Sequence, residues 1–367
     1  MIIYLLNLFF VCICAGGMCK ANNGLVSTQK GKQKFINVVL LLLIFTSLIL
    51  VAGLRNGVGT DFSTYSGLFS HKMTLPFKEI IKEKEWGFWG ISSLLGNITN
   101  NVTVVFFVHA TIIIVLIVGT FFKYSTMFEF TLFLYIATMD YYGSFNGMRQ
   151  WTAAAVLFLG IKYIYKHQII RYMLLVLVAS TFHNTAFIMI PVYFFVTQKA
   201  WSWKVKAISA TIFLAVFLFP GISNSLFAVM EGTDYQHYMI KSATDDGVNI
   251  LRVLVAFVPV VISYIYYKFL YRNEEEKKWI NILINFSLLN FLTLTLALRS
   301  TVLARIAMYF NLYNGLLFPY FLRIFKKNSR WIAVLIMVVL FLAYMIMLLP
   351  TDSNLLPYRT LFGQIFY

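Results

Sequence analysis

The sequence predicts an all-α fold, a polytopic integral membrane bundle of about twelve transmembrane helices, some of them short or broken. Hydrophobic residues make up 60% of the 367 residues and charged residues only 12%. The mean hydropathy is +0.77, and apolar runs of membrane-spanning length recur along the whole chain. These runs are too long and too uniformly apolar for barrel strands of about 10 residues. We therefore expect residues 1–367 to form a single transmembrane domain, with no separate soluble domain.

The apolar runs place the expected helices in order. The first run, residues 1–18, lacks the positive amino-terminal region of a signal peptide, so we expect a retained first helix. The other runs are 35–54, 102–122, 127–142, 150–166, 169–182, 185–197, 207–223, 251–270, 279–297, 306–322 and 331–349. The pair 169–182 and 185–197 is short for a span, which predicts a helix-break-helix hairpin around His183 and Asn184.

The charges orient this bundle. Nineteen of the thirty Lys and Arg residues fall in one set of loops, and most of the acids fall in the other set. Cytoplasmic loops collect Lys and Arg, so the second set is predicted to lie outside. It includes loop 55–101, whose part from residue 71 to 97 is expected to form an amphipathic segment on the outer surface, and loop 224–250. This bias and the anionic lipids of the bilayer explain the net charge of +16, so no nucleic-acid partner is expected.

Arginines on the predicted outer side are candidates for binding a polyanion. Five stand at helix ends: Arg55, Arg149, Arg252, Arg299 and Arg305. A guanidinium donates two parallel hydrogen bonds to a diphosphate and stays charged in a partly dehydrated site. The alternative is that each arginine reaches the membrane interface or pairs with a nearby acid. Arg149, beside Gln150 at a helix start, and Arg299 and Arg305, which flank a short outer turn, are stronger candidates than Arg252.

Residues 52–65 carry the strongest local pattern. Gly57 and Gly59 loosen the exit from a helix, Thr60 is placed to cap a new one, and Asp61 and Tyr65 then share a helix face. An acid and an aromatic ring on one face suit sugar binding or the orientation of a base, although a capped amphipathic turn is an equally physical interpretation. A similar spacing in 232–238 makes Asp234 and Tyr238 weaker candidates, which either line the same cavity or match by chance.

His183 lies in a polar break within an apolar hairpin. An ionisable residue at such a place suggests function, and histidine suits general-base catalysis near neutral pH. The alternative is a structural histidine bonded to a backbone group that the break exposes. The chain has no Walker loop, nucleophile elbow or zinc-protease motif, and we expect no cofactor and no metal site. The alternative is a metal ion bound by Asp61 together with Asp234.

Four segments together resemble a known family. RNGVGTDFSTY at 55–65, RQ at 149–150, FHNTA at 182–186 and RIAMYF at 305–310 resemble, in order and spacing, the EpsG-like branch of the Wzy-type polysaccharide polymerases. The resemblance covers residues 35 to about 325 and implies a multi-pass enzyme of the bacterial cytoplasmic membrane. It implies transfer of a growing glycan from a polyprenyl diphosphate carrier to a sugar hydroxyl of an incoming lipid-linked repeat unit, at the outer face. A flippase and a chain-length regulator are candidate partners.

The chemistry of the candidate residues suggests the role of each in such a reaction. Arg55, Arg149, Arg299 and Arg305 would bind the diphosphate and stabilise the charge on it as it leaves. His183 or Asp61 would take the acceptor proton. Gln150, Tyr65 and Tyr309 would contact the diphosphate or the sugar.

Three other classes remain as alternatives. A ligase that moves finished glycans shares the donor chemistry. A flippase or transporter needs charges spread through the middle of the membrane, often at broken helices. An acyltransferase would need His183 on a path to the cytoplasmic face, whereas the candidate arginines are predicted to lie outside.

Overall fold

A computed structural model of the chain describes residues 1–18, 32–214, 247–299, 301–351 and 354–366. Helices form nearly all of its regular structure, and the strands in the described residues are the short pair β1 (Tyr358–Arg359) and β2 (Ile365–Phe366). The predicted all-α fold is therefore confirmed for this part of the chain.

Four described helices are long and apolar enough to cross a membrane. They span Lys34–Gly53, Val102–Tyr124, Glu274–Leu296 and Lys327–Leu348. Shorter apolar helices cover Ile2–Gly17, Phe128–Ala137, Ile169–Ser180, Asn184–Val196 and Ile250–Ile265. A membrane protein fits this pattern, while the count of about twelve spans stays a prediction.

The chain divides into two compact units. The first comprises Met1–Tyr163, Gln168–Phe187 and Phe325–Tyr367, and the second comprises Ile164–His167 and Ile188–Ile324. The helices of the first unit are α1 (Ile2–Gly17), α2 (Lys32–Gly53), α3 (Phe62–Thr74), α4 (Phe77–Ile80), α5 (Trp86–Gly96), α6 (Val102–Tyr124), α7 (Phe128–Ala137), α8 (Asp140–Gly143), α9 (Met148–Leu159), α11 (Ile169–Ser180), η5 (Lys327–Ser329) and α19 (Arg330–Leu348). Within this unit α2 packs on α1 and α6, α6 on α9, and α9 on α11. Two of the four unit boundaries fall within α10 (Ile161–Tyr165) and η2 (Asn184–Ile188).

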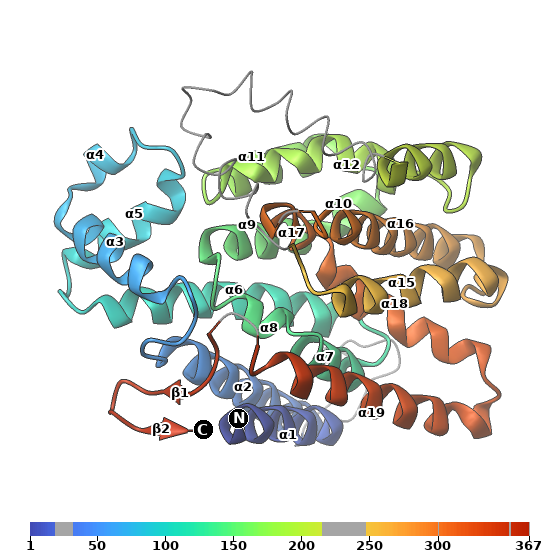
Figure 1. Ribbon diagram of the computed structural model, residues 1–367, viewed down its shortest axis with the longest axis horizontal. Coiled ribbons are helices and arrows are strands. Elements are labelled where there is room, and N and C mark those ends of the chain that lie inside the picture. Colours follow the sequence, from blue (N-terminus) through green and yellow to red (C-terminus); the bar gives the residue numbers. More distant parts are fainter. Residues whose placement is uncertain (19–31, 215–246, 300, 352–353, 367) are drawn as a thin grey trace. The chain divides into compact units, whose positions relative to one another are not determined.

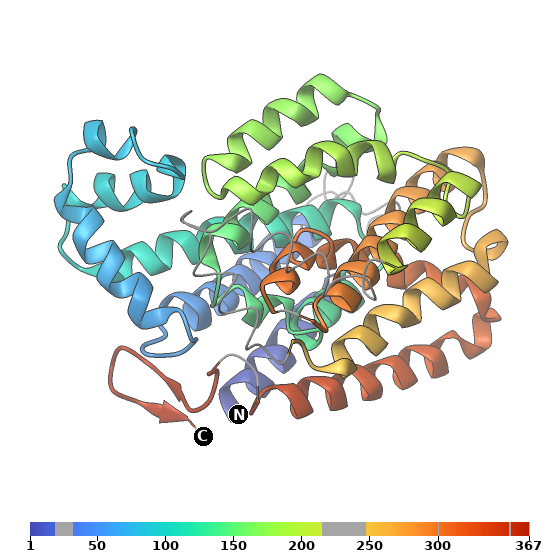
Figure 2. The same ribbon diagram turned by 45° about the horizontal axis from the view of Figure 1, so that its top comes forward.

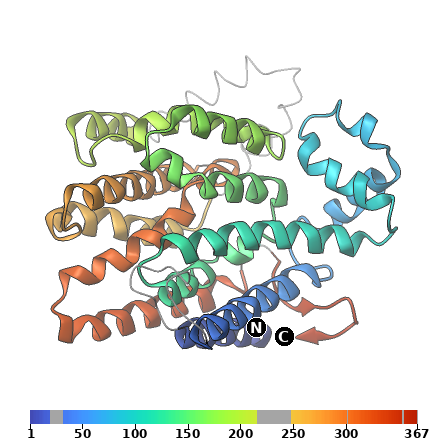
Figure 3. The ribbon, with the colours of Figure 1, turned by 180° about the vertical axis from the view of Figure 1, so that it is seen from behind.

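The predicted outer segment after α2 folds into α3, α4 and α5, which group beside the amino-terminal end of α6 (Figure 1, and from behind in Figure 3). The expected amphipathic segment at 71–97 is not a single helix. Pro76 precedes α4 with an extended backbone, and Glu85 precedes α5 with a left-handed backbone, so the chain turns twice. An apolar cluster that includes Phe69, Phe88 and Phe106 joins these helices to α6.

The carboxyl-terminal hairpin of β1 and β2 lies beside the turn that follows α2 (Figure 2). Asn56 N donates to Arg359 O at 2.9 Å, and Leu361 N donates to Leu54 O at 3.1 Å. Gly59 N donates to Asn354 O at 3.0 Å. The end of the chain thus fixes the glycine-containing segment that the sequence singled out.

The second unit is built around α16 (Glu274–Leu296), which packs on α12 (Met189–Val196), α15 (Ile250–Ile265), α17 (Thr301–Ala307) and α18 (Asn311–Phe321). Its 3₁₀ turns are η3 (Tyr267–Phe269) and η4 (Leu322–Ile324). Asn273 caps α16 by accepting a hydrogen bond from Glu276 N at 2.8 Å. Arg323 donates to Glu276 Oε1 at 2.6 Å and to Leu270 O at 2.9 Å, which joins the end of α18 to the start of α16.

Gly96 and Gly67 make a matched pair that tests the packing of α3 against α5. A Cβ at Gly96 would lie 1.9 Å from Met73 O, whereas a Cβ at Gly67 meets no atom within 4 Å. Because the obstructing atom belongs to the backbone, Gly96→Ala should lower the free energy of unfolding by about 1–3 kcal/mol or more. Gly67→Ala should leave stability unchanged or raise it by up to ~1 kcal/mol. Thermal unfolding in detergent measures both, and equal melting temperatures would contradict this packing.

Candidate functional site

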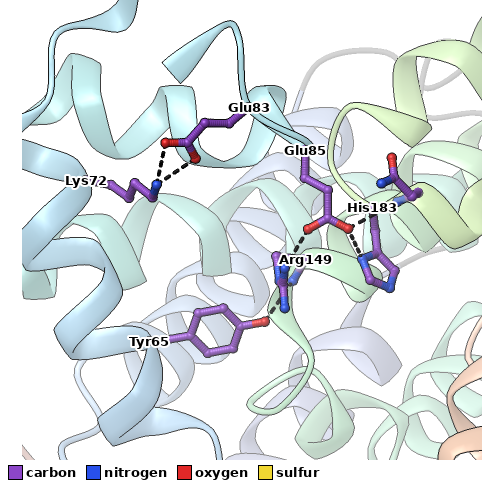
Figure 4. A network of polar contacts seen from close by, with 7 residues as sticks. Tyr65, Lys72, Glu83, Glu85, Arg149 and His183 are labelled. Atoms are coloured by element: carbon purple, nitrogen blue, oxygen red, sulfur yellow. Dashed lines mark hydrogen bonds and ion pairs between the residues drawn. The ribbon is translucent and has the colours of Figure 1, made fainter. Parts of the chain in front are cut away.

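One carboxylate, that of Glu85, joins three distant parts of the first unit (Figure 4). Arg149 Nη1 donates to Glu85 Oε2 at 2.6 Å, and His183 Nδ1 contacts Oε1 at 2.5 Å. Asn184 N donates to the same Oε1 at 3.2 Å. Glu85 is only 8% exposed, whereas the side chains of His183 and Arg149 are 18% and 29% exposed. We call Glu85, Arg149, His183 and Asn184 the Glu85 cluster.

The backbone around Glu85 is specialised. Glu85 has φ 60° and ψ 34°, the left-handed region, which costs a residue with a Cβ about 1–2 kcal/mol. Gly87 N and Phe88 N both donate to Thr181 O, at 2.9 and 3.4 Å. A Cβ at Gly87 would lie 2.2 Å from Thr181 Oγ1, so only glycine permits this approach. The start of α5 therefore lies directly against the predicted break that follows α11.

Arg149 is placed by the turn that begins α9. Gly147 has φ 59° immediately before the helix, and its N–H donates to Asp61 Oδ2 at 2.9 Å. Asn146 Oδ1 in turn accepts from Asp61 N and from Thr60 Oγ1, each at 3.1 Å. Asp61 thus bonds the backbone of the turn that positions Arg149.

The predicted cap at Thr60 is wrong. The helix α3 begins at Phe62 with Asp61 at its N-cap position, and no side chain caps it. The Thr60 hydroxyl donates to Asn146 instead, because loop 57–61 is docked on the turn at 145–147.

Aromatic side chains form the apolar surroundings of Arg149. Its guanidinium lies 5.5 Å from the centre of the Trp89 ring, within range of a cation–π interaction. The buried Tyr65 hydroxyl accepts from Arg149 N at 3.5 Å, and the Tyr65 ring stacks on Phe69. Tyr65 and Asp61 thus both contact the turn that begins α9, while Gln150 is buried within that helix.

The contacts of Glu85 favour its ionised form. Burial alone raises the pKa of this carboxyl, but the hydrogen bond from His183 and the charge of Arg149 outweigh burial. The net pKa lies below its ordinary value. Glu85 is therefore a carboxylate at neutral pH, which fits its role as a shared acceptor of three hydrogen bonds.

Arg55 occupies a different environment from the one predicted. It is 2% exposed, and it donates to Ala52 O and, at 3.1 Å, to Phe145 O. Its guanidinium lies 4.6 Å from the centre of the Phe145 ring. Burial lowers its pKa to about 10, although nearby tyrosines partly oppose this, so it stays charged at neutral pH. Its contacts are those of a structural residue that joins the end of α2 to the turn before α9.

The remaining candidates belong to the second unit or lie outside the described residues. Arg252 is in the first turn of α15, the exposed Arg299 follows α16, and Arg305 is in α17. Val248 N donates to Ala297 O at 3.0 Å, and Val253, Leu294 and Ala307 pack in one apolar cluster, so these three arginines belong to segments that meet. Tyr309 is buried just after α17. Asp234 and Tyr238 lie outside the described residues.

Sequence reasoning missed Glu85. Its neighbours alternate Lys and Glu from residue 82 to 85, a pattern typical of a solvated helix face. The available signal was its place just before the apolar run that starts at Trp86, where an acid often precedes a helix. Within the part of the chain that the structure describes, no group of three His, Cys, Asp or Glu side chains could hold a metal ion.

In a comparison with known protein families, the model of the EpsG family matches residues 38–360. The chain belongs to the EpsG family. This membership confirms the resemblance seen in the sequence and indicates that the EpsG-family protein is a polysaccharide polymerase in a membrane. Neither the curated proteins nor the solved structures contain a match to it.

Arg55→Lys tests the structural role of Arg55 in this EpsG-family protein. Lysine keeps the charge but cannot reach Ala52 O and Phe145 O together, so one buried carbonyl loses its donor. We expect the free energy of unfolding to fall by about 1–3 kcal/mol, with a lower melting temperature in detergent. A variant of normal stability that makes no polymer would contradict the structural role and restore Arg55 as a substrate-binding residue.

Proposed function

We propose that this protein extends a bacterial surface polysaccharide at the outer face of the cytoplasmic membrane, using glycans carried on a polyprenyl diphosphate. The observation that supports this best is the Glu85 cluster. In a member of the EpsG family, one buried carboxylate holds a histidine and an arginine together, and both of these side chains keep partial exposure. A candidate base beside a candidate anion-binding group suits transfer from a diphosphate leaving group.

The proposed reaction has one step. A hydroxyl oxygen of the incoming repeat unit attacks the anomeric carbon of the sugar that links the growing glycan to its carrier. The new glycosidic C–O bond forms as the C–O bond to the diphosphate breaks, and the electron pair of that bond goes to the diphosphate oxygen. The hydroxyl proton passes to His183. The products are the elongated glycan on the carrier of the repeat unit and a free polyprenyl diphosphate.

Arginines carry the electrostatic part of the proposal. Arg149 is engaged by Glu85 through Nη1, and its exposed remainder is suited to meet a phosphate oxygen. Arg299 and Arg305 in the second unit, both exposed, are also proposed to bind diphosphate, with Arg252 as a weaker candidate. Arg55 leaves the proposed site because it is buried, and Asp61 becomes a residue that positions Arg149.

The orientation of the protein in the membrane is proposed from the distribution of Lys and Arg among its loops. The segments that hold the Glu85 cluster belong to the set of loops with fewer Lys and Arg, so this end is proposed to face outward. Lipid-linked oligosaccharides and the bilayer are the expected partners, with a flippase and a chain-length regulator acting beside the enzyme.

The function is tested by separating the lipid-linked glycans of the native bacterium on a gel, with and without the gene. If the protein is the polymerase, loss of the gene should replace a ladder of chain lengths by single repeat units on the carrier. A normal ladder that stays on its carrier would identify a ligase. Absence of lipid-linked glycan from the outer face would identify a flippase, and either of these results would overturn the proposal.

Substitutions at Arg149 and His183 test the proposed site. Arg149→Ala should abolish the ladder, and Arg149→Lys should restore it poorly because a point charge cannot make two parallel contacts. His183→Ala should slow polymerisation by roughly 10²- to 10⁴-fold, the usual contribution of a general base. Membrane levels and melting temperature are measured in parallel. A normal ladder from either alanine variant removes that residue from the site, and loss of the folded protein instead of activity assigns it a structural role.

A further inference from the structure

Glu85 is nearly enclosed, and both of its oxygens are already in use. Oε2 accepts from Arg149, and Oε1 contacts His183 Nδ1 and accepts from Asn184 N. With 8% exposure, it is poorly placed to touch a substrate itself. Whatever it contributes to the reaction must pass through the residues that it holds.

The carboxylate determines which nitrogen of His183 carries the proton. An ionised carboxylate accepts hydrogen bonds but cannot donate one. Because the pKa of Glu85 is lowered, the 2.5 Å contact requires His183 Nδ1 to be the donor. A neutral imidazole with its proton on Nδ1 has its lone pair on Nε2. The contact thus selects the tautomer whose Nε2 can accept a proton from a sugar hydroxyl.

The same carboxylate sets the position of Arg149 relative to His183. Its two oxygens face two different elements, the start of α9 and the break after α11. The segment that brings Glu85 there has a left-handed backbone at Glu85 and a close approach at Gly87 that excludes any Cβ. Strain of this kind persists only where the surrounding contacts enforce it.

We propose that Glu85 is the positioning residue of the polymerisation site, which holds His183 with its proton on Nδ1 and fixes Arg149 beside it. The inference rests on the proposed function, because it assigns Glu85 a role in that same reaction. It makes the base and the anion-binding guanidinium a preorganised pair, so that neither has to be ordered when the substrates arrive.

The chain provides a matched control two residues away. Glu83 also pairs with a cation, Lys72, at 2.6 Å, and Lys72 lies 5.8 Å from the centre of the Trp89 ring. This pair joins α3 to the segment before α5, as Figure 4 shows, and makes no described contact with His183 or Arg149. Glu83→Gln therefore removes a carboxylate from the same segment without touching the proposed site.

The kinetic test compares Glu85→Gln, Glu83→Gln, His183→Gln and the double variant Glu85→Gln/His183→Gln in the purified full chain, with a synthetic lipid-linked repeat unit. Glu85→Gln should lower kcat by roughly 10- to 100-fold with a smaller change in KM. Glu83→Gln should stay within about twofold of the unmodified protein. In the His183→Gln background, Glu85→Gln should slow the reaction by a smaller factor than it does in the unmodified protein. The part of its effect that passes through His183 is lost once His183 is gone, and only the part that passes through Arg149 remains.

A tautomer measurement tests the inference even if the protein does not polymerise glycans. Nitrogen NMR of histidine-labelled protein, with the His183 signals assigned by their loss in His183→Gln, should show the proton on Nδ1 in the unmodified protein. The preference should weaken in Glu85→Gln. A proton on Nε2 in the unmodified protein, an unchanged kcat in Glu85→Gln, or additive losses in the double variant would each overturn the positioning role. If the unmodified purified protein makes no glycan ladder but its His183 tautomer is as expected, the proposed function is rejected instead.

Discussion

The site in the first unit depends on the stabilisation of one buried carboxylate. Removing an ionised carboxyl from water costs several kcal/mol unless charges and hydrogen bonds replace the water. Arg149, His183 and Asn184 N supply that replacement, and they come from parts of the chain that lie 64 to 99 residues from Glu85 in sequence. If any of the three contacts is lost, the free-energy cost of burying Glu85 is no longer compensated. The stability of the buried carboxylate therefore constrains α5, α9 and the break after α11 together.

Packing around the cluster strengthens this constraint. Phe88 follows Glu85 by three residues and belongs to the apolar cluster that contains Tyr65, Phe69 and Trp89. These rings limit water on one side of the Arg149–Glu85 pair, and an ion pair with less water around it is electrostatically stronger. The apolar cluster and the polar cluster therefore support each other, because the rings pack only when α5 starts where Glu85 places it.

Hydropathy predicted the all-α membrane fold because every span must present apolar side chains to the hydrocarbon core and satisfy its own backbone hydrogen bonds. The break at His183 was also visible, since the mostly polar segment 180–185 within an apolar hairpin is a local signal. Glu85 was not visible, because its burial results from contacts with residues 64 and 98 positions away, while its neighbours resemble a solvated helix. The burial of Arg55 was not visible for the same reason. The sequence shows a cation at a helix end, but not the Phe145 carbonyl to which it donates.

In the proposed function, segment 55–65 supports the site without taking part in the reaction. Gly57 and Gly59 have positive φ angles, Arg55 is buried against carbonyl groups, and Asp61 bonds the turn before α9. Each of these features serves to dock one loop on the turn that begins at Phe145. That turn in turn places Arg149, so the motif determines the geometry of the site from a distance. In the proposed reaction, the roles of base and anion-binding group are therefore assigned to His183 and Arg149, whose side chains remain partly exposed.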